Sequence, residues 1–150
     1  IMNNILREVA DQEFHFIPLR GSYNIGVDIS QEQKGIGKTE DKNRIQFDFE
    51  EGKRLIHLFR KYLGIDVQCQ GVFLYPGKGS GIGWHTDEDR PGDRYYLIHC
   101  DQADKSYFQL GEHIFWDKEG WNINHFNSGT EHRVVNLGCT RLSIGFKKLN

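Results

Sequence analysis

The residues best suited to chemistry are His85 and Asp87, which follow a glycine-rich run that begins at Tyr75. Side chains two apart on a strand point to the same face of a sheet, so this imidazole and this carboxylate would converge. Nitrogen and oxygen donors held together in this way bind transition metals. We therefore predict a metal site at His85 and Asp87 that needs one further protein ligand.

His132 is the best candidate for that ligand among the seven histidines. It precedes Arg141 and Ser143, which lie on what the apolar pattern predicts to be the next strand. A two-residue turn at residues 137 and 138 would make the two strands a hairpin and place all three side chains on one face. His125 lies in the same segment and is the alternative to His132.

Two histidines and one carboxylate leave three coordination positions of a metal open. Non-haem iron(II) uses this arrangement when it binds oxygen together with a co-substrate, whereas zinc prefers a fourth tight ligand or a single water. Arg141 would lie between apolar neighbours on an interior face, where an unpaired guanidinium is costly. It therefore needs an acid, which is either a protein carboxylate or a ligand.

Gly77, Gly79, Gly81 and Gly83 alternate with other residues in the run before His85. If this run is extended, the glycines share the face of His85, so a molecule that approaches the metal would meet backbone there. A flexible turn without a functional role is the alternative.

Length and composition indicate a single domain. A chain of 150 residues is long enough to bury a core and to keep an interior site. The net charge of −2 gives no overall basic field for nucleic acid. Three widely spaced cysteines, with no recognisable signal peptide or membrane-length apolar run, favour a reduced, cytoplasmic setting.

The chain is predicted to be mostly β. Apolar residues at helical spacing before Gly64 predict a helix over 50–63, and a shorter one is expected within 1–13. Residues 30–44 are polar, so we expect a loop, either a lid or a solvated connection. Strands are expected at 14–29 (one or two), 67–75, 94–100, 106–110, 113–116, 122–126, 132–136 and 139–147.

Many short strands with a supporting helix are typical of a jelly roll. We therefore expect a double-stranded β-helix as one domain over residues 1–150. Residues 1–64 would support the fold, and residues 65–150 would form the metal-binding core.

The pattern Tyr-Pro-Gly-x-Gly-x-Gly-x-x-x-His-x-Asp at residues 75–87 resembles the prolyl-hydroxylase branch of the 2-oxoglutarate- and iron(II)-dependent oxygenases. The Asp93-Arg94 pair is also similar to that branch. The segments around residues 84–92, 120–122 and 141–146 resemble small oxygenases of this superfamily that bacteriophages encode. The resemblance covers about residues 70–147 and implies a cupin-like, double-stranded β-helix fold.

The resemblance implies an oxidoreductase: a dioxygenase that hydroxylates a C–H bond of a small molecule or a peptide, a prolyl residue included. It implies iron held by His85, Asp87 and His132, with 2-oxoglutarate as co-substrate, O2 as oxidant and ascorbate as a further cofactor. Turnover would couple hydroxylation to the conversion of 2-oxoglutarate into succinate and carbon dioxide.

The resemblance also implies how 2-oxoglutarate would be held. Arg141 would bind its distal carboxylate, and Ser143 would add a hydroxyl. Prolyl hydroxylases use a tyrosine on a middle strand for the same purpose, but that position falls at Asp101 here. Tyr75 or Tyr96 would have to take its place.

Two other classes stay open on the sequence alone. One is a cupin-like metal enzyme that does not use 2-oxoglutarate, and the other is a catalytically silent jelly-roll binding module. The expected partner is a small molecule or a peptide, without a nucleic-acid or membrane signal, and the chain would be a monomer or a small homo-oligomer. If the protein is phage-encoded, the expected location is the host cytoplasm.

Overall fold

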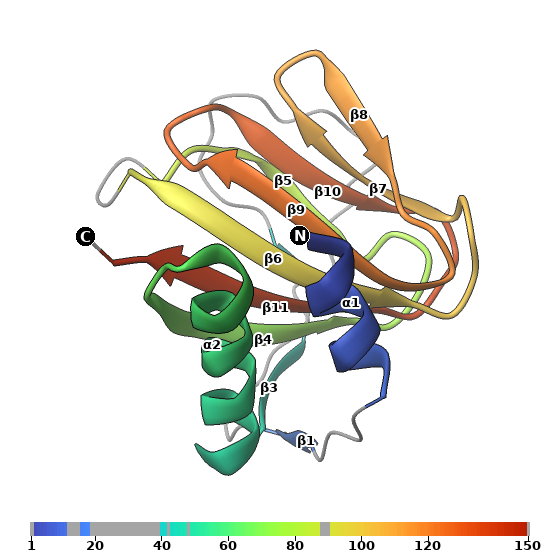
Figure 1. Ribbon diagram of the computed structural model, residues 1–150. Helices are drawn as coiled ribbons and strands as arrows, with labels where there is room; N and C mark the ends of the chain where they lie inside the picture. Colours follow the sequence, from blue (N-terminus) through green and yellow to red (C-terminus); the bar gives the residue numbers. More distant parts are fainter. Residues whose placement is uncertain are drawn as a thin grey trace.

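Two antiparallel β-sheets lie face to face in the computed structural model, with two helices against one of them (Figure 1). The structure describes residues 2–11, 16–18, 40–41, 43–47, 49–87 and 91–149. Side chains are described for residues 2–11, 52–87 and 91–149. Neither helix in this part of the chain is both long and apolar enough to cross a bilayer.

Most of the predicted elements are present within a few residues of their expected ends. The helices are α1 (Met2–Ala10) and α2 (Phe49–Leu63). The strands are β1 (Phe16–Pro18), β2 (Glu40–Asp41), β3 (Asn43–Phe47), β4 (Val67–Tyr75), β5 (Gly81–His85), β6 (Asp93–Cys100), β7 (Ser106–Leu110), β8 (His113–Trp116), β9 (Gly120–Asn127), β10 (His132–Asn136) and β11 (Arg141–Lys148).

The strand order identifies the fold. The six-stranded sheet has the order β1-β3-β4-β11-β6-β9, and the five-stranded sheet has the order β2-β5-β10-β7-β8. From β4 to β7 successive strands alternate between the two sheets, and from β8 to β11 they alternate again. As a result β10 lies between β5 and β7 in one sheet, and β11 lies between β4 and β6 in the other. This antiparallel, interleaved arrangement is a double-stranded β-helix, so the predicted fold class is confirmed.

Both helices cover the outer face of the six-stranded sheet (Figure 1). Ile5 and Val9 of α1 and Leu55 and Phe59 of α2 are buried there against the outer side chains of β6 and β11. Phe146 is among these outer residues, and its ring lies 4.9 Å from that of Phe59. The main apolar core is therefore outside the sandwich, and the space between the sheets is free to contain polar residues.

The expected hairpin between residues 132–136 and 139–147 is wrong. Strand β10 pairs with β5 and β7, whereas β11 pairs with β4 and β6 in the other sheet. A two-residue type I′ turn needs positive φ at both central residues, which Leu137 does not adopt, and only Gly138 has a positive φ. The chain instead crosses between the sheets over residues 137–140.

Asn136 holds this crossing in place. Its buried Oδ1 accepts hydrogen bonds from the backbone N–H of Gly138 (3.0 Å) and of Cys139 (2.9 Å). Its Nδ2 donates to the Cys139 carbonyl (2.8 Å) and to Ser80 Oγ (3.2 Å). One amide side chain therefore fixes both the crossing and the adjacent turn before β5.

Part of the expected loop at residues 30–44 is strand. Residues 40–41 form β2, which pairs with β5, and residues 43–44 begin β3, which pairs with β4. The rest of that loop lies outside the described residues, as do the expected strands at 14–29 apart from β1. Whether the loop acts as a lid therefore stays a prediction.

Replacing Asn136 by alanine should lower the free energy of unfolding by about 3 kcal/mol, because it leaves buried backbone groups at the crossing without partners. Urea denaturation monitored by circular dichroism would measure the loss. Asn127→Ala is a matched control, since the Asn127 side chain accepts a single, exposed hydrogen bond within the described residues, from the Gly129 N–H, and it should cost less than about 1 kcal/mol. Equal losses would show that Asn136 is an ordinary turn residue.

Candidate metal site and its surroundings

His85 and His132 lie directly opposite each other on paired strands. His85 is the last residue of β5, His132 is the first residue of β10, and the two are register partners. Their ring centroids are 4.2 Å apart. Asp87 follows just beyond the end of β5, where its backbone N–H donates to the Ser128 carbonyl (2.9 Å). Neighbouring strand ends therefore bring two ligands together, and a backbone bond fixes the third.

The ligand atoms of these three residues converge. Asp87 Oδ1 lies 3.9 Å from Nε2 of His85, and Oδ2 lies 3.8 Å from Nε2 of His132. All three candidate ligand atoms fall within 4.8 Å of one another. The cluster is set into the protein, since the two imidazoles are almost fully buried and the carboxylate is partly exposed.

The backbone selects the tautomer of both histidines. Nδ1 of His85 is 2.8 Å from the Gly83 carbonyl, and Nδ1 of His132 is 2.7 Å from the Thr130 carbonyl. A carbonyl only accepts hydrogen bonds, so Nδ1 carries the proton in each ring and Nε2 keeps its lone pair. Both lone pairs then face the carboxylate, which is the protonation state and orientation that metal ligation needs.

A β-bulge in β5 makes this geometry possible. His132 pairs with His85, but Val134 pairs with Ile82, so β5 contains one more residue than β10 over this stretch. Ile82 therefore joins the interior cluster with Val134, although it has the opposite parity to His85. The prediction that all the glycines of residues 77–83 share the face of His85 is wrong for this reason.

His125 is not part of the cluster. It lies on the outer face of β9, where its ring stacks on Tyr95 at 4.2 Å with an interplanar angle of 4°. Its Nε2 is 3.6 Å from Asp93 Oδ1, and its side chain is 38% exposed. The structure therefore brings His132, rather than the alternative His125, next to His85.

Arg141 lies between the sheets at the start of β11, and it has a protein carboxylate as partner. It is 1% exposed, and its Nε donates to Asp117 Oδ2 at 2.8 Å. The same Asp117 oxygen accepts a 2.6 Å hydrogen bond from Ser106 Oγ. The sequence did not predict Asp117 as this partner. It begins a run of charged residues after β8, and such runs are usually exposed rather than buried.

The guanidinium is charged but incompletely paired. Burial by itself would lower the pKa of Arg141, but the Asp117 carboxylate, together with Tyr75 and Cys100, raises that pKa above its usual value. Nη1 of Arg141 is buried and has no hydrogen-bond partner within the described part of the chain. An unpaired buried donor of this kind is costly, so the site is suited to an acceptor that comes from outside the protein.

The other predicted co-substrate residues surround Arg141 on the same interior. The Tyr75 ring centroid lies 5.5 Å from the guanidinium carbon, and Ser143 is buried two residues further along β11. Tyr96 crosses the Cα of its partner Gly145, where a Cβ would come within 2.6 Å of the ring. Burial, assisted by Tyr75 and Asp87, raises the pKa of Tyr96, so its hydroxyl stays a neutral donor.

Comparisons with known proteins give likenesses only at the level of shape. No protein-family model matches this sequence, and no curated protein matches it significantly. A 2OG-Fe(II) oxygenase family oxidoreductase from Burkholderia pseudomallei is 15% identical, with 99% of this chain and 78% of that chain covered and a TM-score of 0.49.

Two further solved structures show the breadth of these likenesses. A prolyl-4-hydroxylase from Pseudomonas putida is 17% identical, with 99% of this chain and 84% of that chain covered and a TM-score of 0.48. A predicted oxalate decarboxylase from Thermotoga maritima is 13% identical, with 79% and 90% covered and a TM-score of 0.46. The class of this protein is defined by its own topology and site. It is a double-stranded β-helix protein with a candidate metal site of two histidines and one carboxylate.

If the three residues act as one metal site, His85→Ala, Asp87→Ala and His132→Ala should each fold and retain at least about tenfold less iron than the wild type. Metal analysis after purification from iron-replete cells, with melting temperatures on the same samples, would measure this. His125→Ala is the control and should keep wild-type iron. Retention of iron in His132→Ala with loss of iron in His125→Ala would show that His125, rather than His132, is the metal ligand.

Proposed function

We propose that this protein is an iron(II)- and 2-oxoglutarate-dependent oxygenase that hydroxylates a C–H bond of a small molecule or a peptide. The observation that carries the proposal is the pairing of two features in one interior. One is the cluster of His85, Asp87 and His132, with both imidazole lone pairs turned inward. The other is the buried guanidinium of Arg141, which has an unpartnered Nη1.

The donor set of the cluster fits iron(II). Two neutral nitrogens and one carboxylate give a borderline-hard site that leaves several coordination positions for other molecules. A structural zinc site would need a fourth protein ligand, and the cluster found among the described residues has three. When bound, iron(II) and 2-oxoglutarate would supply the oxidising chemistry, with O2 as oxidant.

The chain's own residues would bind and orient the co-substrate. Nη1 of Arg141 can donate to a carboxylate, and the Ser143 hydroxyl lies on the same face of β11. Tyr75 and the neutral Tyr96 add hydroxyl groups to the same interior. The rings of Phe108 and Phe126, with centroids 5.8 and 4.9 Å from that of His132, exclude water from one side of the cluster.

The bond from Arg141 to Asp117 favours a second candidate. An arginine whose Nε already donates to a protein carboxylate at 2.8 Å does not need a ligand carboxylate, which fits a cupin-like metal enzyme that does not use 2-oxoglutarate. In that enzyme, the ion pair would only stabilise the fold. The two candidates differ in whether the guanidinium also binds a ligand, which can be measured directly.

Anaerobic titration with iron(II) and 2-oxoglutarate, followed by the visible charge-transfer band of a chelated keto acid, tests the proposal. In Arg141→Gln, the affinity for 2-oxoglutarate should fall because a desolvated charge partner is lost. Such a truncation costs about 2–5 kcal/mol, which is roughly thirty-fold to several thousand-fold in affinity. Iron binding should survive, since Arg141 is outside the metal cluster.

Asp117→Asn is the matched control, because it removes the protein carboxylate and keeps the guanidinium. It should lower the melting temperature, since an uncompensated buried charge remains, and it should leave 2-oxoglutarate affinity unchanged or higher. If both variants lose stability and neither changes the titration, Arg141 only neutralises Asp117. In that case 2-oxoglutarate drops out of the proposal.

A further inference from the structure

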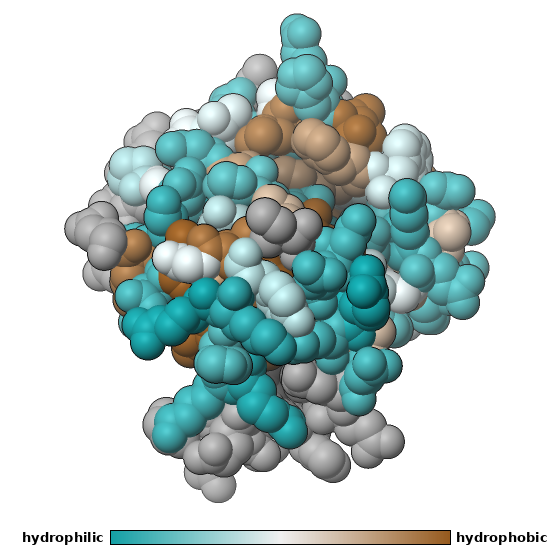
Figure 2. All heavy atoms as spheres, viewed as in Figure 1, coloured by the Kyte–Doolittle hydropathy of each residue, from teal (hydrophilic) through white to brown (hydrophobic). Residues whose placement is uncertain are grey.

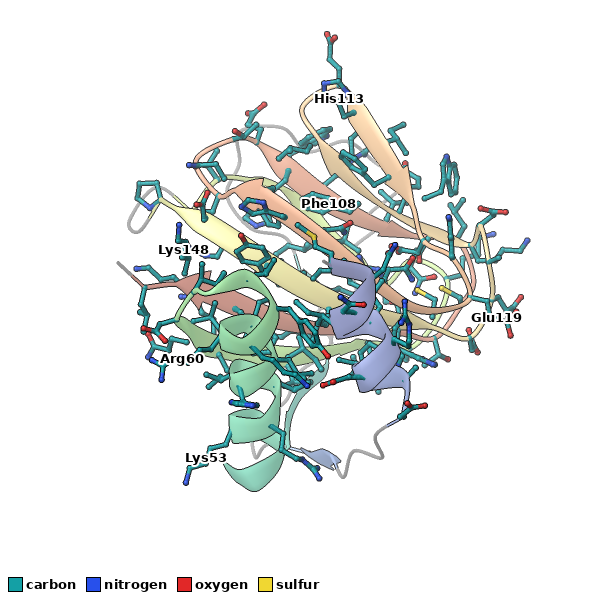
Figure 3. All side chains as sticks on the ribbon, viewed as in Figure 1. Lys53, Arg60, Phe108, His113, Glu119 and Lys148 are labelled. Atoms are coloured by element: carbon teal, nitrogen blue, oxygen red, sulfur yellow. The ribbon has the colours of Figure 1, made fainter. Side chains whose placement is uncertain are left out.

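Strand β8 exposes apolar side chains at the edge of the five-stranded sheet. Ile114, Phe115 and Trp116 are each 47% exposed. Figure 2 shows hydrophobic surface gathered over the hairpin of β7 and β8. Figure 3 labels His113 at the start of β8 and Phe108 on the partner strand β7. Exposed apolar residues next to a candidate catalytic centre indicate a binding surface more strongly than isolated ones do.

The two faces of β8 differ in what they contact. On the outer face, Trp116 packs edge-on against Tyr107 at 4.8 Å, and Tyr107 accepts a hydrogen bond from Arg133. That face is occupied by the protein's own contacts. On the inner face, Phe115 stacks on Phe108 at 6.3 Å with an interplanar angle of 29°.

From Phe115 a row of rings leads inward to the metal cluster. The centroid of Phe108 lies 4.6 Å from that of Phe126, and the centroid of Phe126 lies 4.9 Å from that of His132. Phe108 and Phe126 are buried, so only the outer end of the row at Phe115 meets solvent. We call Phe115, Phe108 and Phe126 the aromatic row. It joins the solvent-exposed ring of Phe115 to the candidate metal ligands through a continuous series of ring contacts.

Asn124 adds a polar contact beside this row. It lies two residues before Phe126 on the same face of β9, which places the two side chains about 7 Å apart. Its Nδ2 is buried and has no hydrogen-bond partner among the described residues. Asn122, the preceding residue on this face of β9, uses its amide to bind the Lys118 backbone: Oδ1 accepts from the Lys118 N–H, and Nδ2 donates to the Lys118 carbonyl. Within the described residues, Asn124 Nδ2 makes no comparable bond, so this donor can serve a ligand.

We infer that the aromatic row and Asn124 form the binding site for the primary substrate. The substrate group would be an uncharged apolar side chain with an adjacent carbonyl, as in an apolar residue of a peptide. The apolar part would enter at the exposed ring of Phe115 and follow the aromatic row inward, and the carbonyl would accept a hydrogen bond from Asn124 Nδ2. This inference rests on the proposed function, because the bound group would be a substrate only if the cluster that contains His132, at the inner end of the row, is the catalytic metal site.

The probes are N-acetyl-L-leucine amide and N-acetyl-L-phenylalanine amide, with the lysine and glutamate amides as charged comparisons and thymidine as a different class. Their binding to metal-free protein would be measured by chemical-shift changes in the protein. Their approach to the cluster would be measured by relaxation enhancement from bound manganese(II). The apolar amides should bind, and their nuclear relaxation should be strongly enhanced by the bound manganese(II). The charged amides and thymidine should show neither effect.

Phe115→Ala should weaken binding of the apolar amides about tenfold, because it removes the solvent end of the row. Asn124→Leu should weaken it by a similar factor, because it removes the donor and keeps the side-chain size. Ile114→Ala is the matched control: it changes an equally exposed residue on the other face of β8 and should leave binding unchanged.

The outcomes separate this inference from the proposed function. If the apolar amides bind metal-free protein through Phe115 and Asn124, but manganese does not bind, the substrate site stands and the oxygenase proposal fails. If manganese and 2-oxoglutarate bind, but the apolar amides bind no better than the charged ones, the inference falls. It also falls if thymidine alone binds, or if Ile114→Ala weakens binding as much as Phe115→Ala.

Discussion

The position of the apolar core is the constraint on which the rest of the structure depends. Helices α1 and α2 cover the outer face of the six-stranded sheet, and Leu55, Phe59, Ile144 and Phe146 are completely or almost completely buried there. Because this layer supplies much of the hydrophobic burial, the interior between the sheets can contain charged and hydrogen-bonding residues without loss of the fold. Those residues include the candidate metal ligands and the buried pair of Arg141 and Asp117. The site is therefore a consequence of where the core lies.

Much of the fold could be predicted because the strands have short apolar patterns bounded by turn residues. Strands β4, β7, β8 and β10 begin and end where the pattern places them. Pairing could not be predicted from neighbouring residues alone, since both edges of β10 are occupied by β5 and β7. The bulge in β5 could not be predicted from the local sequence either, because it depends on the pairing with β10, which places both Ile82 and His85 on the interior side.

The candidate site was partly accessible to the same reasoning. Residue type and spacing were enough to select His85, Asp87 and His132, because ligand chemistry is carried by the side chains themselves. The demand of a buried arginine for an acid could also be predicted. The identity of that acid could not, since Asp117 is one of 21 acidic residues and reaches Arg141 only after the chain has crossed between the sheets.

The crossing at Asn136 connects two strands that each place a functional side chain in the interior, so the register of these strands affects the candidate site. Residues 137–140 join the strand that begins with His132 to the strand that begins with Arg141. In a sheet, a shift of one residue exchanges the two faces of a strand. A one-residue shift of β11 against β4 and β6 would therefore turn Leu142 inward and move the guanidinium of Arg141 beneath the helices. The pairing of β11 with both of its neighbours therefore decides which of its side chains enter the interior.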